Sequence, residues 1–171
     1  MDKHYGYLLL AFEEAEQAGA EGTFPIGAVI VDDAGNVVSR GRNRVFSDCD
    51  TTAHAEVDAI RQAGRYMLDL EQKRFVPDNG LTLYTTCEPC PMCTGTIVLS
   101  KIKRVVWAAN DEAIGAFKLF QAGASVLPVY DDLFKDIEII AAPYPDLEAR
   151  QRKMLAEWNI GRGYTDTYWK K

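Results

Sequence analysis

Residues 81–108 read LTLYTTCEPCPMCTGTIVLSKIKRVVWA, and this stretch decides the fold class. Residues 81–86 have the composition of a strand, and the turn that follows leads to Pro91, which suits the first position of a helix. We expect that helix to run to about Ser100 and a second strand to cover residues 104–108. A strand–helix–strand unit predicts two parallel neighbours in a sheet that helices cover.

The flanking sequence extends this unit on both sides. Further strands are expected at residues 26–31, 37–41 and 137–140, the first two forming a hairpin, and further helices at 2–18, 53–63 and about 147–158. Gly19 is the expected stop of the first helix, and Thr51 or Thr52 is the expected N-cap of the second. The predicted fold is therefore α/β with three layers, α/β/α. A mixed sheet of about five strands has helices on both faces, in a single domain over 1–171 whose residues 159–171 form a C-terminal tail.

Composition places the chain among ordinary globular proteins. Its 171 residues suit one core, and it is 47% hydrophobic and 26% charged. No apolar run approaches the roughly 20 residues that span a bilayer, so no membrane partner is expected. Residues 1–5 lack the order of a signal peptide, which makes the cytoplasm the predicted location.

The charge balance bears on the partner. The net charge is −6 and the pI is about 5.0, whereas proteins that bind phosphate backbones are usually basic, at least locally. The acidic balance favours a small-molecule substrate over tRNA, although a local basic patch stays possible.

Three cysteines crowd into seven residues, and they indicate metal or redox chemistry rather than a disulfide framework. Cys90 and Cys93 offer thiolates across two intervening residues, and His54 offers an imidazole from a distant segment. Zinc favours this mixture, and three protein ligands leave its fourth position open, as in catalytic sites. Glu56, two residues past the histidine, is then available to move protons.

The cysteines allow two other interpretations. A structural zinc site would use the four cysteines of the chain, including Cys49, and a thioredoxin-like site would use only Cys90 and Cys93. Neither explains His54 and Glu56. The catalytic interpretation has one difficulty: His54 and Glu56 are two residues apart, and such residues do not share a face in the middle of a helix. A position at a helix start relaxes this objection.

Residues 52–56 (TAHAE) and 86–93 (TCEPCPMC) resemble the cytidine deaminase-like superfamily, in particular its guanine deaminase and tRNA-adenosine deaminase branch. Residues 26–31 and 41–44 fit the same branch, and the similarity covers about residues 5–120. The resemblance implies an enzyme, a hydrolytic deaminase that uses Zn²⁺. The expected ligands are His54, Cys90 and Cys93, and the expected proton shuttle is Glu56.

The resemblance also implies substrate contacts. Asn43 matches a residue that hydrogen-bonds the base or sugar, and Gly27 and Ala28 match a place where the backbone approaches the substrate. Cys87 is expected to be a packed thiol. Glu88 could orient the cysteine turn or contact the substrate, but an exposed loop acid is the commoner case. Residues 161–169 are aromatic with two glycines. Similar tails help to close the site in guanine deaminase-like proteins, but a tail that packs its aromatic side chains on the domain surface is the favoured interpretation.

Several substrates follow from the resemblance. A purine base or nucleoside is the leading prediction, a tRNA adenosine is the second, and a cytosine or other pyrimidine derivative is the third. A catalytically silent partner subunit is a further alternative, although such subunits often lose the glutamate that Glu56 supplies. Lys118–Phe120 stands where guanine deaminases are expected to have acidic residues. The superfamily commonly assembles as dimers, so a homodimer is expected.

Overall fold

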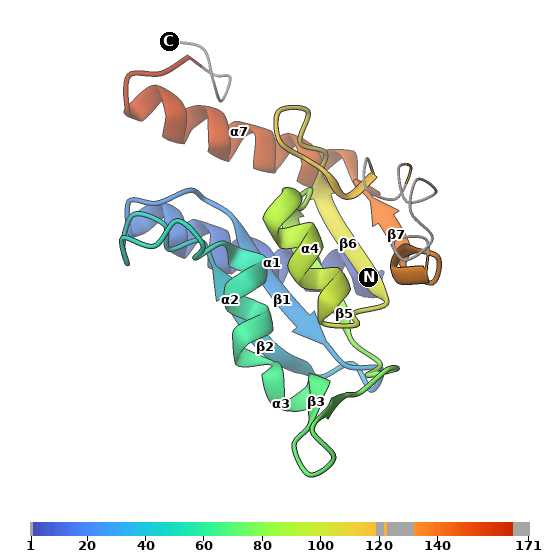
Figure 1. Ribbon diagram of the computed structural model, residues 1–171. Helices are drawn as coiled ribbons and strands as arrows, with labels where there is room; N and C mark the ends of the chain where they lie inside the picture. The colour runs from blue at the N-terminus through green and yellow to red at the C-terminus, as the bar shows by residue number, and fades with distance from the viewer. Residues whose placement is uncertain (1, 119–121, 123–131, 166–171) are drawn as a thin grey trace.

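The computed structural model describes residues 2–118, 122 and 132–165, and its centre is a mixed five-stranded sheet (Figure 1). The strand order is β2-β1-β5-β6-β7. β1 pairs antiparallel with both β2 and β5, whereas β5, β6 and β7 run parallel. The bounds are β1 Gly27–Val31, β2 Val37–Arg42, β5 Thr82–Cys87, β6 Arg104–Ala109 and β7 Glu138–Ala141. The predicted mixed sheet is confirmed.

Helices cover both faces of this sheet. On one face, α1 (Lys3–Ala20) and α7 (Pro145–Gly161) pack through Leu8, Phe12 and Leu147 against β1, β5 and β6. On the other face, α2 (Ala55–Gln62) and α4 (Pro91–Leu99) bury their apolar sides over the same strands, as Figure 1 shows. This is the predicted three-layer α/β/α arrangement. Within the described ranges, no helix is both long and apolar enough to cross a membrane.

Two glycines of the β1–β2 hairpin allow helices to approach the sheet closely. A Cβ atom at Gly27 would lie 2.1 Å from the backbone oxygen of Ala11 in α1. A Cβ atom at Gly41 would lie 2.3 Å from the backbone nitrogen of Ala59 in α2. Both distances are below any real contact, so the hairpin accepts both helices only because these positions lack side chains.

The structure differs from the sequence-based expectation at three places. Gly19 does not end α1, which continues to Ala20; the left-handed residue that follows is Gly22, with φ 78°. α2 begins at Ala55 and has no threonine cap. Residues 64–75, whose mixed composition has no clear period, form a short helix and a two-stranded hairpin: α3 Gly64–Met67, β3 Leu68–Asp69 and β4 Arg74–Phe75.

Candidate active site

His54, Cys90 and Cys93 converge at the ends of two helices. Their ligand atoms all lie within 4.8 Å of one another, and His54 Nδ1 is 3.5 Å from Cys93 Sγ and 3.6 Å from Cys90 Sγ. Bond lengths of about 2.3 Å for Zn–S and about 2.0–2.1 Å for Zn–N separate two ligand atoms of a tetrahedral site by about 3.6 Å. The spacing and the donor types therefore fit zinc.

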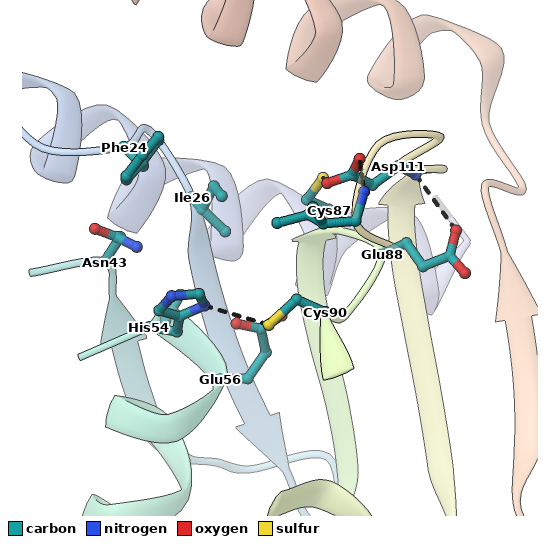
Figure 2. Close-up of a pocket in the computed structure, with 11 residues that line it drawn as sticks. Phe24, Ile26, Asn43, His54, Glu56, Cys87, Glu88, Cys90 and Asp111 are labelled. Atoms are coloured by element: carbon teal, nitrogen blue, oxygen red, sulfur yellow. Dashed lines mark hydrogen bonds between the residues drawn. The ribbon is translucent and has the colours of Figure 1, made fainter. Parts of the chain in front are cut away.

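Both ligand segments lie at the N-terminus of a helix, where His54 and Cys90 are the N-cap residues. This position explains how His54 and Glu56, which are two residues apart, reach one site. His54 precedes α2 with an extended backbone (φ −78°, ψ 155°), so His54 and Glu56 do not follow helical spacing. Cys90 precedes α4 in the same way, and Pro91 opens that helix as predicted. The expected threonine caps are wrong, because the residue that occupies the cap position of α2 is the histidine itself. Figure 2 shows the His54 ring directed at Cys90.

The site favours one thiolate even before a metal is considered. The neighbouring Cys93 thiol and the His54 side chain lower the pKa of Cys90 to about 4, against the effect of burial. The same hydrogen bond raises the pKa of His54. Interaction with Cys90, together with burial, raises the pKa of Cys93. A negative sulfur beside a helix N-terminus is the state that binds a metal cation.

Glu56 lies inside the site and does not belong to the ligand triad. It is 4% exposed, and its Oε2 accepts a hydrogen bond from Cys93 Sγ at 3.3 Å. Burial raises the pKa of the Glu56 carboxyl. A raised pKa makes the carboxyl a better proton acceptor than an ordinary glutamate, which suits a general acid–base group.

A pocket opens beside the triad, with a volume of about 190 Å³. It is smaller than the roughly 300–1,000 Å³ of sites for drug-sized ligands, so it suits a single planar base. Figure 2 shows Phe24, Ile26 and Asn43 on one side and Cys87, Glu88 and Asp111 on the other. Phe24 and Ile114 are lining residues that the motifs did not identify, whereas Ile26 begins the 26–31 segment that fits the family. Phe24 lies two residues before that segment, which was the available signal.

Glu88 is not the exposed acid that was expected. It is 4% exposed, and its Oε2 accepts from the backbone N–H of Asp111 at 3.3 Å and pairs with Lys118 Nζ at 3.3 Å. Cys87, by contrast, is the packed thiol that was expected, because it is buried and its Sγ lies 3.8 Å from Asp111 Oδ2. Of Lys118–Phe120, Leu119 and Phe120 lie outside the described residues.

Asn43 lines the opposite side of the pocket and is 1% exposed. Its Oδ1 accepts hydrogen bonds from Thr23 Oγ1 at 2.6 Å and from the backbone N–H of Val45 at 3.1 Å. Gly27 and Ala28 are the first two residues of β1 and are buried, next to the lining residue Ile26. Close packing against α1 explains why position 27 is a glycine. A substrate contact of Gly27 or Ala28 stays a prediction.

An aromatic cluster with one arginine adjoins the pocket. Phe24 packs on Trp158 of α7 with ring centroids 4.2 Å apart, and Phe46 lies within 6.0 Å of both. The Arg162 guanidinium sits 3.4 Å from the centroid of Trp158 and 4.9 Å from that of Tyr164. Residues 166–169 of the C-terminal tail lie outside the described residues, so neither the closing tail nor the ordinary surface tail is tested there.

Exposed Cys49 does not join the triad, which disfavours the four-cysteine site. Residues 1–109 match the family model of the cytidine and deoxycytidylate deaminase zinc-binding region. The chain belongs to this family. This deaminase family membership confirms the predicted superfamily, the enzyme class of zinc-type nucleobase or nucleoside deaminases and the Zn²⁺ cofactor.

Relatives of this deaminase have different substrates. A tRNA-specific adenosine deaminase of Haemophilus influenzae is 43% identical over 106 residues, which are 62% of this chain and 58% of that protein. A guanine deaminase of Bacillus subtilis is 38% identical over 135 residues, 77% of this chain and 75% of that protein. A solved structure from work on tRNA:A34 deaminases superposes with a TM-score of 0.68 at 31% identity, covering 86% of this chain and 99% of that chain.

Proposed function

We propose that this protein removes an amino group from a purine base or purine nucleoside by hydrolysis. The observation that carries the proposal is the convergence of His54, Cys90 and Cys93 beside the buried carboxyl of Glu56, next to a pocket sized for one base. Similarity to a guanine deaminase and to tRNA-specific adenosine deaminases supports a purine.

Each residue has a distinct part in this reaction. When bound by His54, Cys90 and Cys93, zinc lowers the pKa of water toward neutrality and so supplies a nucleophile. Glu56 would take a proton from the attacking water and deliver it to the ring nitrogen next to the carbon that bears the amino group. Glu56 then passes the second proton to the departing ammonia, so that water and the amino compound give the oxo compound and ammonia. Asn43 donates a hydrogen bond to the bound base.

The wall around Glu88 bears on which purine is used. Its carboxylate is buried in an ion pair with Lys118 and accepts from the backbone of Asp111. A carboxylate engaged in this way accepts fewer hydrogen bonds from the N–H groups of a guanine ring. The proposal is therefore a purine substrate, with guanine disfavoured relative to other aminopurines.

A tRNA adenosine is the second candidate, and the aromatic cluster favours it. Phe46 is 53% exposed, and Arg162 stacks on Trp158 beside the pocket. Bases that flank a target nucleotide in single-stranded RNA stack on such aromatic and guanidinium surfaces. The net charge of −6 acts against binding a polynucleotide. Arg42 and Arg44 near the pocket are already paired with carboxylates.

The test is ammonia release from a panel of adenine, guanine, their nucleosides, cytosine, cytidine and unmodified tRNA, each with and without a chelator. We expect chelator-sensitive release from a purine. Release from cytosine or cytidine alone would contradict the purine proposal, and no release from any compound by zinc-loaded protein would indicate the silent-subunit alternative.

The tRNA candidate has a separate test. Phe46→Ala is expected to leave turnover of a free purine within about twofold, whereas loss of one stacked base weakens tRNA binding by roughly fivefold or more. Salt-independent or undetectable tRNA binding contradicts this candidate. The homodimer and the cytoplasmic location stay predictions.

A further inference from the structure

We infer that Thr23 is a positioning residue that holds Asn43 with its amide nitrogen toward the substrate, so that this wall of the pocket offers a hydrogen-bond donor. The inference rests on the proposed function, because it concerns the substrate contact of Asn43. Thr23 is fully buried, lies 20 residues before Asn43 and belongs to none of the recognised motifs.

The orientation of the amide follows from its neighbours. A backbone N–H can only donate, and the N–H of Val45 lies 3.1 Å from one side-chain atom of Asn43, which must therefore be the oxygen. The backbone N–H of Phe46 points at Thr23 Oγ1 at 3.4 Å, so that hydroxyl accepts there and has its own proton free to donate. It donates to Asn43 Oδ1 at 2.6 Å. The backbone N–H groups of Val45 and Phe46 thus fix the direction of each hydrogen bond between Thr23 and Asn43.

As a consequence, only the oxygen of the Asn43 side-chain amide is hydrogen-bonded to the protein within the described residues. Both hydrogen bonds to Asn43 end on Oδ1, and among the described residues Nδ2 donates to no protein acceptor. Figure 2 shows this nitrogen on the pocket side of Asn43. A substrate must then present an acceptor, a ring nitrogen or a carbonyl, to this wall.

Neighbouring contacts hold Thr23 itself in place. The next residue, Phe24, stacks on Trp158, and the carbonyl of Pro25 accepts from Gln151 Nε2 at 2.9 Å. The loop before β1 is therefore anchored to α7 while the Thr23 hydroxyl is anchored to Asn43. A rigid supporting shell of this kind keeps a recognition group in one geometry.

The test removes the hydroxyl and keeps the shape. Thr23→Val should raise KM about fivefold and leave kcat within about twofold, because one of the two hydrogen bonds that orient Asn43 is lost. Thr23→Ser, which keeps the hydroxyl, should restore the parent KM. Thr85→Val is the matched control: Thr85 is equally buried, but its hydroxyl has no partner within the described structure, so its KM should not change.

A double-mutant cycle separates positioning from general packing. In an Asn43→Ala background, Thr23→Val should change KM by less than about twofold, because the group that Thr23 orients is gone. Equal effects of Thr23→Val in the two backgrounds would overturn the inference. If Thr23→Val does not fold, Thr23→Ala takes its place in the cycle.

A second measurement keeps the inference apart from the proposed function. In ¹⁵N-labelled protein, Thr23→Val should shift the side-chain amide resonances of Asn43, whereas Thr85→Val should leave them unchanged. If the parent protein releases ammonia from nothing on the panel, the proposed function fails, yet these resonances still decide the orientation. Unshifted Asn43 resonances in Thr23→Val refute the role of Thr23 whatever the activity.

Discussion

The two walls of the pocket are built in different ways. The metal wall is lined by His54, Glu56 and Cys90, with Cys93 buried behind them, and the recognition wall is lined by Phe24 and Asn43, with Thr23 buried behind Asn43. The metal wall comes from two short motifs, each at the N-terminus of a helix. The recognition wall is assembled from the loop before β1, the residue after β2, and contacts with α7. The difference indicates that the chemistry is encoded locally, whereas recognition depends on packing between distant segments.

Loss of a ligand on the metal wall should have the largest effect. His54→Ala removes one of three donors, so zinc should be lost and deamination should fall below detection. Zinc content by inductively coupled plasma mass spectrometry and ammonia release are the measurements. Cys49→Ala, at an exposed cysteine outside the triad, is the control and should keep both. Full activity in metal-free protein would refute the zinc site.

The proton shuttle should come next. Glu56→Gln keeps the size of the side chain but cannot exchange protons, so kcat should fall by roughly 10²–10⁴-fold while zinc stays bound. Steady-state kinetics and zinc content together make the test. A variant that turns over near the parent rate would show that Glu56 does not carry the protons.

The recognition wall should respond differently. Asn43→Ala removes the donor toward the base, and KM should rise by roughly 10- to 100-fold with a smaller change in kcat. Zinc content should equal that of the parent, because Asn43 is not among the ligating groups. If kcat falls as far as it does for Glu56→Gln, the functional separation of the two walls is wrong.

The smallest expected effect is on stability, and it tests the close packing of β2 on α2 that positions the metal wall. In Gly41→Ala the new methyl group would overlap the backbone of α2, which carries Glu56 and begins directly after His54. Overpacking of this kind costs about 1–3 kcal/mol, which lowers the melting temperature of a domain this size by about 3–10 °C. Gly64→Ala, where nothing lies within 4 Å, is the matched control for thermal unfolding. An unchanged melting temperature for Gly41→Ala would contradict the close packing of β2 on α2.

The sheet and its helices were largely predictable, because each strand and helix carries its own period. The strand–helix–strand unit at 81–108 matches β5, α4 and β6 within one residue at most ends. Helix ends were less predictable: α1 passes through Gly19, since a glycine inside a packed helix costs little compared with the burial of Phe12 and Ala15.

The candidate site was predictable in part. His54, Cys90, Cys93 and Glu56 meet as the motifs indicated. The burial of Glu88 was not predicted, because its ion pair with Lys118 joins residues 30 positions apart in the chain, and no local pattern reveals such a partner. The role of Thr23 was not predictable for the same reason: a lone threonine before a strand is common, and only its contact with Asn43 gives it a role.

The sequence by itself determined the metal and the reaction class, because donor type and spacing within a motif depend on the chemistry of a few adjacent residues. The tertiary structure alone decided which way the amide of Asn43 faces. That direction is set by a hydroxyl from another loop and by backbone N–H groups whose positions exist only after the hairpin and α7 have packed together. Substrate choice therefore rests on contacts that short-range patterns do not encode.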